Sequence, residues 1–386
     1  MMLTDAANRV PVVAVIMPTW GLSMESGTIV SWSVNEGEAT VPGQELVQIE
    51  TTKIVNAVES SVPGVLRRQL ARPGETRACG DLIGIIADSR VTDREIDDFI
   101  AGFARTHLPA RDNAGASGQR RHDSVELPSG PIRYQRIGDS GPPVVFIHGF
   151  GGDLHTWLLN QTEIAAHHYT TYAFDLPGHG ASSKALQVGS VAELARAVDS
   201  LIERLNLGRV HLVGHSLGCA VALEWARNRP ERAMSLSLIA PFGLGGRPNE
   251  AFVSAFVAAQ KARDVQRCLA LLFANPKMVT RAMIETVAQY KRLDGVTEAL
   301  GKLVGMALKD EIPVVPETWL ESLSIPVTVI YGAEDRILTA PGLPSGIQVH
   351  RLSDAGHMPH VEQPARTNEL VLATLAQVDR ATGEHS

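Results

Sequence analysis

One serine between two glycines constrains this chain most, because it stands where a predicted strand meets a predicted helix. Residues 210–213 are mostly apolar and predict a buried parallel strand, and residues 219–227 predict a helix. Between them lies Gly-x-Ser-x-Gly, centred on Ser216. Side chains at Gly214 or Gly218 would collide with the strand or the helix, so the two glycines permit a strained serine. Ser216 then projects from the carboxyl edge of the sheet, and the backbone N–H of Leu217 faces any anion formed beside it.

The five-residue pattern alone is also compatible with a small-residue helix packed on a strand, so the rest of the chain must decide. The length of 386 residues predicts two domains. Residues 1–104 carry 14 acidic and 8 basic side chains, which argues against a nucleic-acid partner and is compatible with a charged protein partner.

The cysteines and the apolar runs predict a cytoplasmic protein without a membrane segment. Three cysteines without a Cys-x-x-Cys pair predict neither a disulfide framework nor a zinc site, and no other metal site is expected. The apolar run at 10–17 contains Pro11, follows a single arginine and precedes no small-residue cleavage site, so it predicts a strand rather than a signal peptide. No other run is long enough to cross a bilayer.

An internal repeat occupies residues 21–87, where three glycines recur at a constant offset of 37 positions. The pairs are Gly27 with Gly64, Gly37 with Gly74, and Gly43 with Gly80. Short strands separated by glycine turns, occurring twice, predict two similar antiparallel sheets related by a pseudo-twofold axis. At the midpoint, residues 49–56 are two alternating stretches around Thr52-Lys53, which predict a tight hairpin with Lys53 at its tip.

Residues 10–88 resemble the lipoyl domains of 2-oxo-acid-type dehydrogenase complexes. The resemblance rests on the Glu-Gly-Glu turn at 36–38, the glycine offsets and the Glu-Thr-x-Lys hairpin. It implies a small, flattened all-β barrel that carries lipoate in amide linkage on Lys53, attached by a lipoate ligase. Biotinyl domains share this architecture but usually have Met on both sides of the lysine, where this chain has Thr52 and Ile54. Thr52 also departs from the Asp that is frequent in lipoyl domains.

A short helix and a linker are predicted over residues 89–124. Thr92-Asp93-Arg94-Glu95 is a capping-box sequence, and an apolar stripe at helical spacing predicts packing on a neighbouring domain. The stripe consists of Ile96, Phe99, Ile100 and Phe103. Residues 105–124 lack an apolar period and predict a linker with a root-mean-square span of about 25 Å. No peripheral subunit-binding domain, common in lipoyl acyltransferases, is evident between the two domains.

Strand and helix patterns alternate over residues 125–380, which predicts a doubly wound, mostly parallel sheet with helices on both faces. A hairpin is predicted at 125–127 and 132–137, further strands at 144–147, 170–174, 234–239, 327–331 and 347–352, and a helix at about 190–205. Helical stretches at about 246–320 interrupt the alternation and predict an inserted cap.

Polar residues after these strands resemble the catalytic set of an α/β-hydrolase. Ser216, Asp335 and His357 follow the family order of nucleophile, acid and histidine, each at the carboxyl end of a predicted strand. The resemblance implies that Ser216 is the nucleophile, His357 the base and Asp335 the acid that holds the imidazole in the useful tautomer. The backbone N–H groups of Phe150 and Leu217 would form the oxyanion hole.

Some neighbouring residues leave alternatives open. Glu334 competes with Asp335 for the role of the acid, and His148 and His215 are neighbours of the oxyanion hole. His148 and His360 are also compatible with ordinary hydrogen-bonded loop histidines.

A thioester-carrying domain joined to a serine-type site indicates acyl transfer. The whole chain resembles the dihydrolipoamide acetyltransferase components of acetoin dehydrogenase systems, which implies that acetyl passes from the Lys53 lipoyl arm to coenzyme A. The implied partners are a thiamine-diphosphate-dependent acetoin-cleaving component and dihydrolipoamide dehydrogenase, within a homo-oligomeric assembly. No phosphate-binding loop marks the coenzyme site, and Arg247, Lys261 and Arg263 are candidates. A lipoyl-tethered hydrolase that releases free acid, and a non-enzymatic lipoyl carrier, remain alternatives.

Overall fold

The structure is a computed structural model that describes residues 12–18, 26–51, 55–60, 62–107, 122–244, 248–307, 317–338 and 347–382. The chain divides into two compact units. The first comprises residues 1–120 with 277–286, and the second comprises residues 121–276 with 287–386. Residues 277–286, which the sequence places in the cap, group with the first unit.

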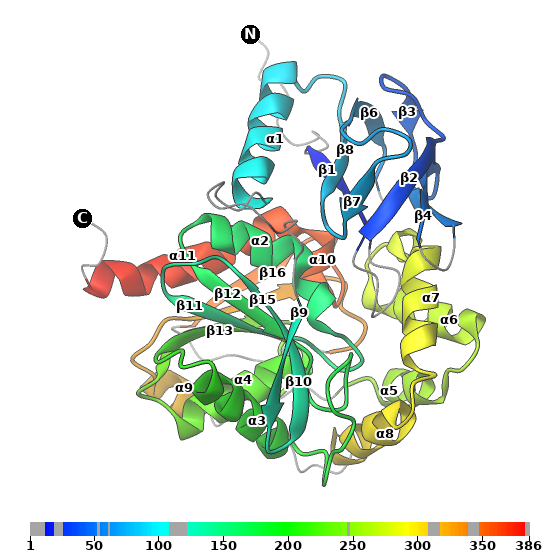
Figure 1. Ribbon diagram of the computed structural model, residues 1–386. Helices are drawn as coiled ribbons and strands as arrows, with labels where there is room; N and C mark the ends of the chain where they lie inside the picture. The colour runs from blue at the N-terminus through cyan, green and yellow to red at the C-terminus, as the bar shows by residue number, and fades with distance from the viewer. Residues whose placement is uncertain are drawn as a thin grey trace. The chain divides into compact units, whose positions relative to one another are not determined.

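The first unit contains two four-stranded antiparallel sheets, which confirms the all-β prediction (Figure 1). The strand orders are β1-β8-β6-β3 and β5-β4-β2-β7. Their bounds are β1 Val13–Ile16, β2 Ser26–Trp32, β3 Ala39–Thr40, β4 Glu45–Glu50, β5 Val55–Glu59, β6 Gly64–Gln69, β7 Thr76–Ala78 and β8 Leu82–Ala87. Fully buried side chains such as Ile29, Leu46 and Leu66 form the core between the sheets.

Glycine geometry and hydrogen bonds both obey the 37-residue offset. Gly37 and Gly74 have φ angles of 88° and 85°, a left-handed conformation that glycine adopts without a Cβ penalty. The N–H of Gly37 donates to the carbonyl of Leu66 at 2.8 Å, and the N–H of Gly74 donates to that of Ile29 at 2.7 Å. In the first bond the donor lies in the first repeat and the acceptor in the second, and in the second bond the order is reversed. The two repeats are therefore related by a pseudo-twofold axis.

Helix α1 (Asp93–His107) follows β8 and begins with the predicted capping box. Glu95 N–H donates to Thr92 Oγ1 at 3.3 Å, and Thr92 N–H donates to Glu95 Oε2 at 2.8 Å. Ile96 is fully buried and packs with Phe99 and Ile100 against β8. The helix continues three residues into the segment predicted as linker, because hydrogen bonding along a helix does not need the apolar stripe that guided the prediction.

The second unit is built on an eight-stranded sheet of order β16-β15-β14-β13-β11-β12-β10-β9. Strands β11 to β16 are parallel, and β9 and β10 form the predicted antiparallel hairpin at one edge. The bounds are β9 His122–Leu127, β10 Gly130–Ile137, β11 Pro143–Ile147, β12 Thr170–Phe174, β13 Val210–His215, β14 Ala233–Ile239, β15 Val327–Gly332 and β16 Gln348–Leu352. This arrangement confirms the predicted doubly wound fold.

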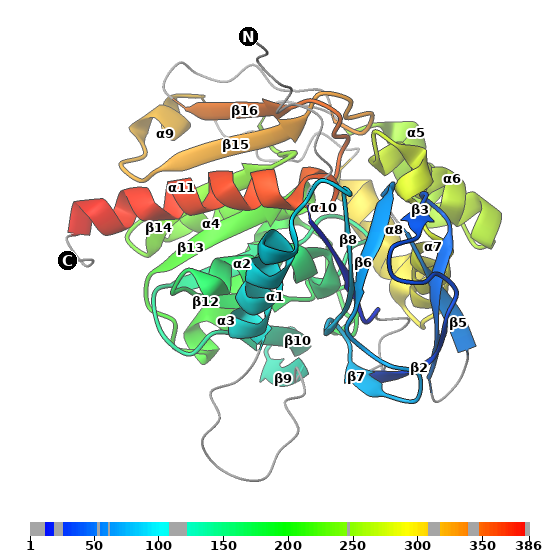
Figure 2. The ribbon, with the colours of Figure 1, turned by 90° about the horizontal axis from the view of Figure 1, so that it is seen from above.

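Helices cover both faces of this sheet, with α3 and α4 on one side and α2 and α11 on the other (Figure 1). Figure 2 shows α11 running along the sheet beside β14 and β15. Their bounds are α2 Leu158–Ala166, α3 Val191–Arg204, α4 Leu217–Asn228 and α11 Pro364–Thr382, with η1 Leu154–Trp157 before α2 and α10 Pro359–Glu362 before α11. Ser190 caps α3 by accepting from the N–H of Glu193 at 3.1 Å.

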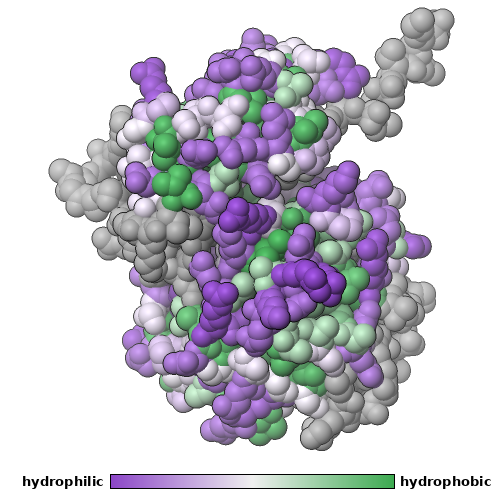
Figure 3. Space-filling view, turned by 90° about the vertical axis from the view of Figure 1, so that its right-hand side faces the viewer, coloured by the Kyte–Doolittle hydropathy of each residue, from purple (hydrophilic) through white to green (hydrophobic). Residues whose placement is uncertain are grey.

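Helical segments separate β14 from β15, where the sequence predicts an insertion. They are α5 Glu250–Ala258, α6 Ala262–Leu272, η2 Pro276–Met278, α7 Arg281–Tyr290, α8 Val296–Ala307 and α9 Glu317–Ser322. Within the described ranges, no helix has both the length and the apolar character of a membrane span. The face drawn in Figure 3 mixes hydrophilic and hydrophobic residues, and the exposed large hydrophobic side chains, such as Val41 and Val188, are far apart in the sequence.

The topology places four loops at the carboxyl edge of the sheet. Ile147 at the end of β11 pairs with Gly214 near the end of β13, and Gly332 at the end of β15 pairs with Leu352 at the end of β16. The chain leaves these strands towards Phe150, Ser216, Asp335 and His357. The fold therefore brings together the loops that carry every predicted catalytic group of this unit.

Candidate active site

Ser216 occupies the sharp turn between β13 and α4. Its φ and ψ are 50° and −115°, a strained conformation for a residue with a side chain. A Cβ at Gly218 would lie 2.0 Å from the carbonyl oxygen of Ile147, and one at Gly214 would lie 2.7 Å from that of Gly218. Glycine is therefore required on both sides, as the sequence predicts, and Ser216 remains partly exposed in an otherwise buried turn.

His357 and Asp335 form a buried hydrogen-bonded pair. His357 Nδ1 donates to Asp335 Oδ2 at 2.8 Å, and the side chains are only 4% and 6% exposed. Asp335 Oδ1 accepts from the N–H groups of Ile337 and Leu338 at 2.7 and 3.0 Å. Burial raises the pKa of Asp335, but the charge and hydrogen bonds of His357 and the loop amides outweigh it, so the net pKa is below its usual value. With Nδ1 donating, Nε2 of His357 carries the lone pair that a base requires.

Glu334, the alternative acid, does not contact His357 among the described residues. Its Oε1 accepts from the N–H of Asp354 at 3.2 Å, and the residue is exposed. The geometry favours Asp335 because only its carboxylate reaches the imidazole.

His215, the residue before Ser216, connects the turn that carries Ser216 to the loop that carries His357. His215 Nε2 donates to the backbone carbonyl oxygen of His357 at 2.8 Å, and the two rings lie 4.9 Å apart. Burial, then the neighbouring His360 and His357 rings, hold the pKa of His215 well below its usual value, so it is a neutral donor. No hydrogen bond joins Ser216 Oγ to His357 within the described part of the chain. A catalytic bond of this kind often closes only when substrate is bound.

Two backbone amides near the turn are the predicted oxyanion-hole donors. Leu217 is the first residue of α4, so its N–H has no intrahelical acceptor. Neither this amide nor that of Phe150 has a hydrogen-bond acceptor among the described residues. A Cβ at Gly149 would lie 3.1 Å from Ser216 Cβ, which places the Phe150 loop directly beside the serine. The two amides are therefore available to an anion at this position.

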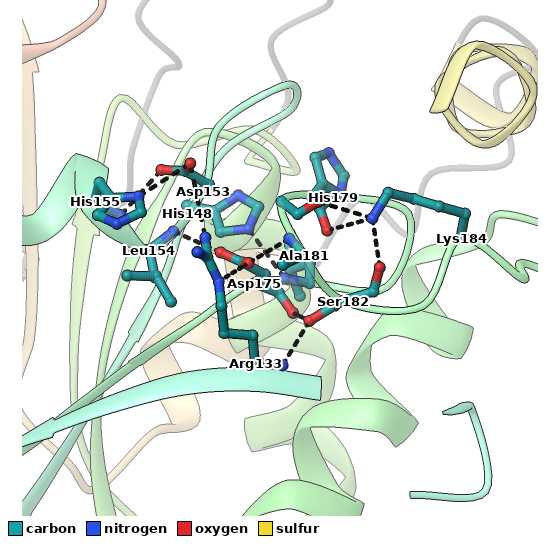
Figure 4. Close-up of polar contacts among 12 residues, drawn as sticks. Arg133, His148, Asp153, Leu154, His155, Asp175, His179, Ala181, Ser182 and Lys184 are labelled. Carbon is teal, nitrogen blue, oxygen red and sulfur yellow. Dashed lines mark hydrogen bonds and ion pairs between the residues drawn. The ribbon is translucent and has the colours of Figure 1, made fainter. Parts of the chain in front are cut away.

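A buried ion pair joins β10 to the loop after β12 (Figure 4). Arg133 Nε donates to Asp175 Oδ2 at 2.7 Å, and Asp175 is fully buried. Asp175 also accepts from the N–H groups of Leu154 at 2.9 Å and Ala181 at 2.7 Å. His148 Nε2 accepts from the N–H of Leu176 at 3.0 Å, so His148 is a hydrogen-bonded loop histidine. Sequence reasoning missed this pair because Arg133 and Asp175 are 42 positions apart.

His360 has neither ring nitrogen hydrogen-bonded among the described residues, unlike an ordinary loop histidine. It is fully buried, and its ring lies 4.6 Å from that of Trp157 and 4.5 Å from that of His215. Burial lowers its pKa to about 3, so the ring is neutral. His360 therefore packs against the rings of Trp157 and His215.

The other predicted site residues are only partly described. Lys53 lies outside the described residues, but Glu50 pairs with Val55, so β4 and β5 flank it as hairpin arms. This pairing fits the hairpin that a lipoyl-lysine would need. Lys261 at the N-cap of α6 and Arg263 within α6 are exposed, and Arg247 lies outside the described residues.

Comparisons with known proteins match parts of both units. The family model described as "Alpha/beta hydrolase family" matches residues 144–370, and that described as "Biotin-requiring enzyme" matches residues 13–86. A protein of Cupriavidus necator is 37% identical over 93% of this chain and 96% of its own length. One of Pseudomonas putida is 38% identical over 93% of this chain and 97% of its own. Each is named the dihydrolipoyllysine-residue acetyltransferase component of an acetoin cleaving system.

A solved structure supports the fold of the second unit. A bacterial membrane phospholipase A, described as a virulence factor, has a TM-score of 0.57 at 27% identity. The match covers 67% of this chain and 86% of the phospholipase.

Proposed function

Because the chain belongs to the family of dihydrolipoyllysine-residue acetyltransferase components of acetoin cleaving systems, we propose that it transfers acetyl from the lipoylated Lys53 arm to coenzyme A. The observation that carries the proposal is the hydrogen bond between Asp335 and His357, which lie on different loops. The loop of His357 also accepts a hydrogen bond from His215, the residue before Ser216. An acyl-transfer site in the same chain as a lipoyl-type domain suits a tethered thioester better than a free ester. Amide-linked on Lys53, lipoate would supply a thiol that carries the acetyl group.

Ser216, His357 and Asp335 act in this proposal as nucleophile, base and orienting acid. Nε2 of His357 takes the proton of Ser216 Oγ while Oγ attacks the thioester carbonyl carbon. The amides of Phe150 and Leu217 stabilise the resulting oxyanion. As the carbon–sulfur bond breaks, His357 returns the proton to the departing thiolate, and acetyl remains on Ser216.

The second half of the reaction reverses these roles. His357 takes the proton of the coenzyme A thiol, and the thiolate attacks the acetyl carbonyl. Ser216 Oγ leaves with the proton from His357, and acetyl-coenzyme A is released. Direct attack of the coenzyme thiol on the donor thioester, with His357 as base, is the other route, and trapping of acetyl on Ser216 by rapid acid quench distinguishes them.

The proposed surroundings follow from the same family membership. We expect a thiamine-diphosphate-dependent acetoin-cleaving component and dihydrolipoamide dehydrogenase as partners, with a lipoate ligase acting on Lys53. The cytoplasm suits a chain with three cysteines and no Cys-x-x-Cys pair. The exposed residues Lys261, at the N-cap of α6, and Arg263, within α6, are candidates for binding the phosphates of coenzyme A. The assembly is proposed to be a homo-oligomer.

The decisive experiment supplies full-length lipoylated protein, acetylated on the reduced arm, with and without coenzyme A. We expect coenzyme-dependent formation of acetyl-coenzyme A that falls at least about 10³-fold in Ser216→Ala and in His357→Ala. Lys53→Ala should gain no lipoyl mass and accept no acetyl group.

Each alternative gives a different product pattern. Release of acetate in place of acetyl-coenzyme A would establish a lipoyl-tethered hydrolase. Undiminished transfer in Ser216→Ala would indicate a carrier without a serine-dependent reaction.

A further inference from the structure

Residue Glu362 lies between the loop of His357 and the segment that precedes η2, and each of its carboxylate oxygens faces one of them. Oε1 accepts from the N–H of Gly356 at 2.7 Å and, more weakly, from that of Met358 at 3.4 Å. Oε2 accepts from the N–H of Ala274 at 2.8 Å. The side chain therefore joins the residues on either side of His357 to the end of the α5–α6 segment (residues 248–274).

A second contact joins the same two loops without any side chain. The N–H of His357 donates to the carbonyl of Leu272 at 2.8 Å. A Cβ at Gly356 would lie 2.6 Å from the backbone nitrogen of Ala274 and 2.8 Å from the oxygen of Leu272. The histidine loop therefore packs against the backbone of residues 272–274 with no space for a side chain at position 356.

The other parts of the α5–α6 segment contact the remaining loops of the site. At its start, the N–H of Asn249 donates to the carbonyl of Ile337 at 2.8 Å, next to the loop that positions Asp335. In its middle, the ring of Phe256 lies 5.7 Å from that of Phe150. A Cβ at Gly151 would be only 2.5 Å from Phe256, so the ring rests on the oxyanion loop. Lys291 contacts both parts of this residue, because its Nζ donates to the backbone carbonyl of Phe256 at 2.6 Å and lies 4.8 Å from the centroid of the ring.

An acetyl group on Ser216 can pass to the coenzyme thiol or to water. Attack by water forms acetate and restores the serine hydroxyl, so transfer requires that the site exclude water while His357 stays in place. The α5–α6 segment touches the acid, oxyanion and histidine loops. It can exclude water and keep His357 in place only if the histidine loop remains attached to it. Glu362 supplies the side-chain part of that attachment.

We propose that Glu362 is a positioning residue that attaches the His357 loop to the α5–α6 segment and thereby favours acetyl transfer to coenzyme A over hydrolysis. The inference rests on the proposed function. In this proposal Glu362 does not contact the substrate. Glu362 acts through the positions of His357 and of residues 272–274.

The test is the substitution Glu362→Gln in the full-length, lipoylated chain. A glutamine keeps one acceptor oxygen and presents an NH₂ group in place of the other, so it must leave either Ala274 or Gly356 facing a donor. We expect the ratio of acetate to acetyl-coenzyme A to rise about tenfold, the change expected for losing a hydrogen bond to a charged group. Both products come from the same folded molecules, so the ratio does not depend on how much of the variant folds.

Glu193→Gln is the matched control. Glu193 accepts from the N–H groups of Gln187, Val188 and Gly189 at 2.7, 3.0 and 2.8 Å, so the substitution removes the same kind of interaction from a loop that carries no predicted catalytic group. Its product ratio should equal that of the wild type. Glu362→Asp keeps both acceptor oxygens on a shorter side chain and should give an intermediate ratio; this variant decides the matter if Glu362→Gln does not fold.

Wild-type product ratios in Glu362→Gln, or an equal rise in Glu193→Gln, would overturn the positioning role while leaving the proposed function intact. A wild-type protein that forms only acetate would instead refute the proposed function. The positioning role would then predict a lower kcat for thioester hydrolysis in Glu362→Gln with an unchanged KM, and an unchanged kcat would overturn it.

Discussion

At the scale of single residues, the site depends on a strained backbone at Ser216 and on glycines that let backbone segments pack in direct contact. Ser216 has a backbone conformation that costs about 1–3 kcal/mol, and the surrounding turn must offset that cost. Gly332 has a comparable role at the end of β15, because a Cβ there would lie 2.1 Å from the carbonyl oxygens of Ala355 and Gly356. The strand that leads to Asp335 can therefore lie directly against the backbone that leads to His357.

Replacement of Gly332 by alanine should force these two segments apart. We expect Gly332→Ala to lower the free energy of unfolding by about 1–3 kcal/mol, as overpacking does. We also expect kcat to fall with little change in KM, because the hydrogen bond between Asp335 and His357 is stretched. Steady-state kinetics and urea unfolding measure the two effects. Gly301→Ala is the control, since nothing lies within 4 Å of a Cβ at that position in α8, and it should be neutral or slightly stabilising. Equal behaviour of the two variants would contradict the steric argument.

At the scale of elements, a buried ion pair connects β10 to the loop after β12. Arg133 and Asp175 have side chains that are 8% and 0% exposed, and the carboxylate also binds two loop amides. Removing one charge from such a pair leaves the other buried without its main partner, which is far more costly than losing a surface pair. The loop that supports His148 therefore depends on this pair.

Substitution of Asp175 by asparagine should lower the free energy of unfolding of the second unit by about 3–5 kcal/mol. Urea unfolding followed by tryptophan fluorescence measures it, because Trp157 and Trp225 are buried in this unit. Asp199→Asn is the comparison, since Asp199 pairs with Arg229 at 2.8 Å but is 18% exposed, and its loss should cost about 1 kcal/mol or less. A larger loss in Asp199→Asn than in Asp175→Asn would show that burial does not govern these pairs.

Elements were predictable where local patterns determine them. The 37-residue glycine offset predicted both sheets of the first unit because φ near 85° at Gly37 and Gly74 is a local requirement. The order of Ser216, Asp335 and His357 predicted which strand ends carry polar groups. The attachment of Glu362 to Ala274 and that of Arg133 to Asp175 span 88 and 42 positions. No local period marks such contacts, so only the tertiary structure reveals them.

At the scale of the whole molecule, the proposed reaction requires the Lys53 arm to reach a serine in the other unit. A tether converts this encounter into a reaction at a local concentration that is roughly millimolar for a short flexible linker. The rate per chain should then be independent of protein concentration in the wild type. Two variants, each lacking one half of the reaction, separate the tethered encounter from the free one.

The Ser216→Ala chain, lipoylated and acetylated on the reduced arm, can donate but not catalyse, and the Lys53→Ala chain can catalyse but not donate. Mixed with excess coenzyme A in a single turnover, they should form acetyl-coenzyme A at a rate per chain that rises in proportion to protein concentration. The acetylated wild type should instead react at a constant rate per chain when it is diluted. Lys53→Ala treated with the acetylating reagent serves as the blank. A wild-type rate per chain that falls in proportion to dilution would contradict a tethered donor, because it would mean that the arm reacts only after a collision between separate molecules.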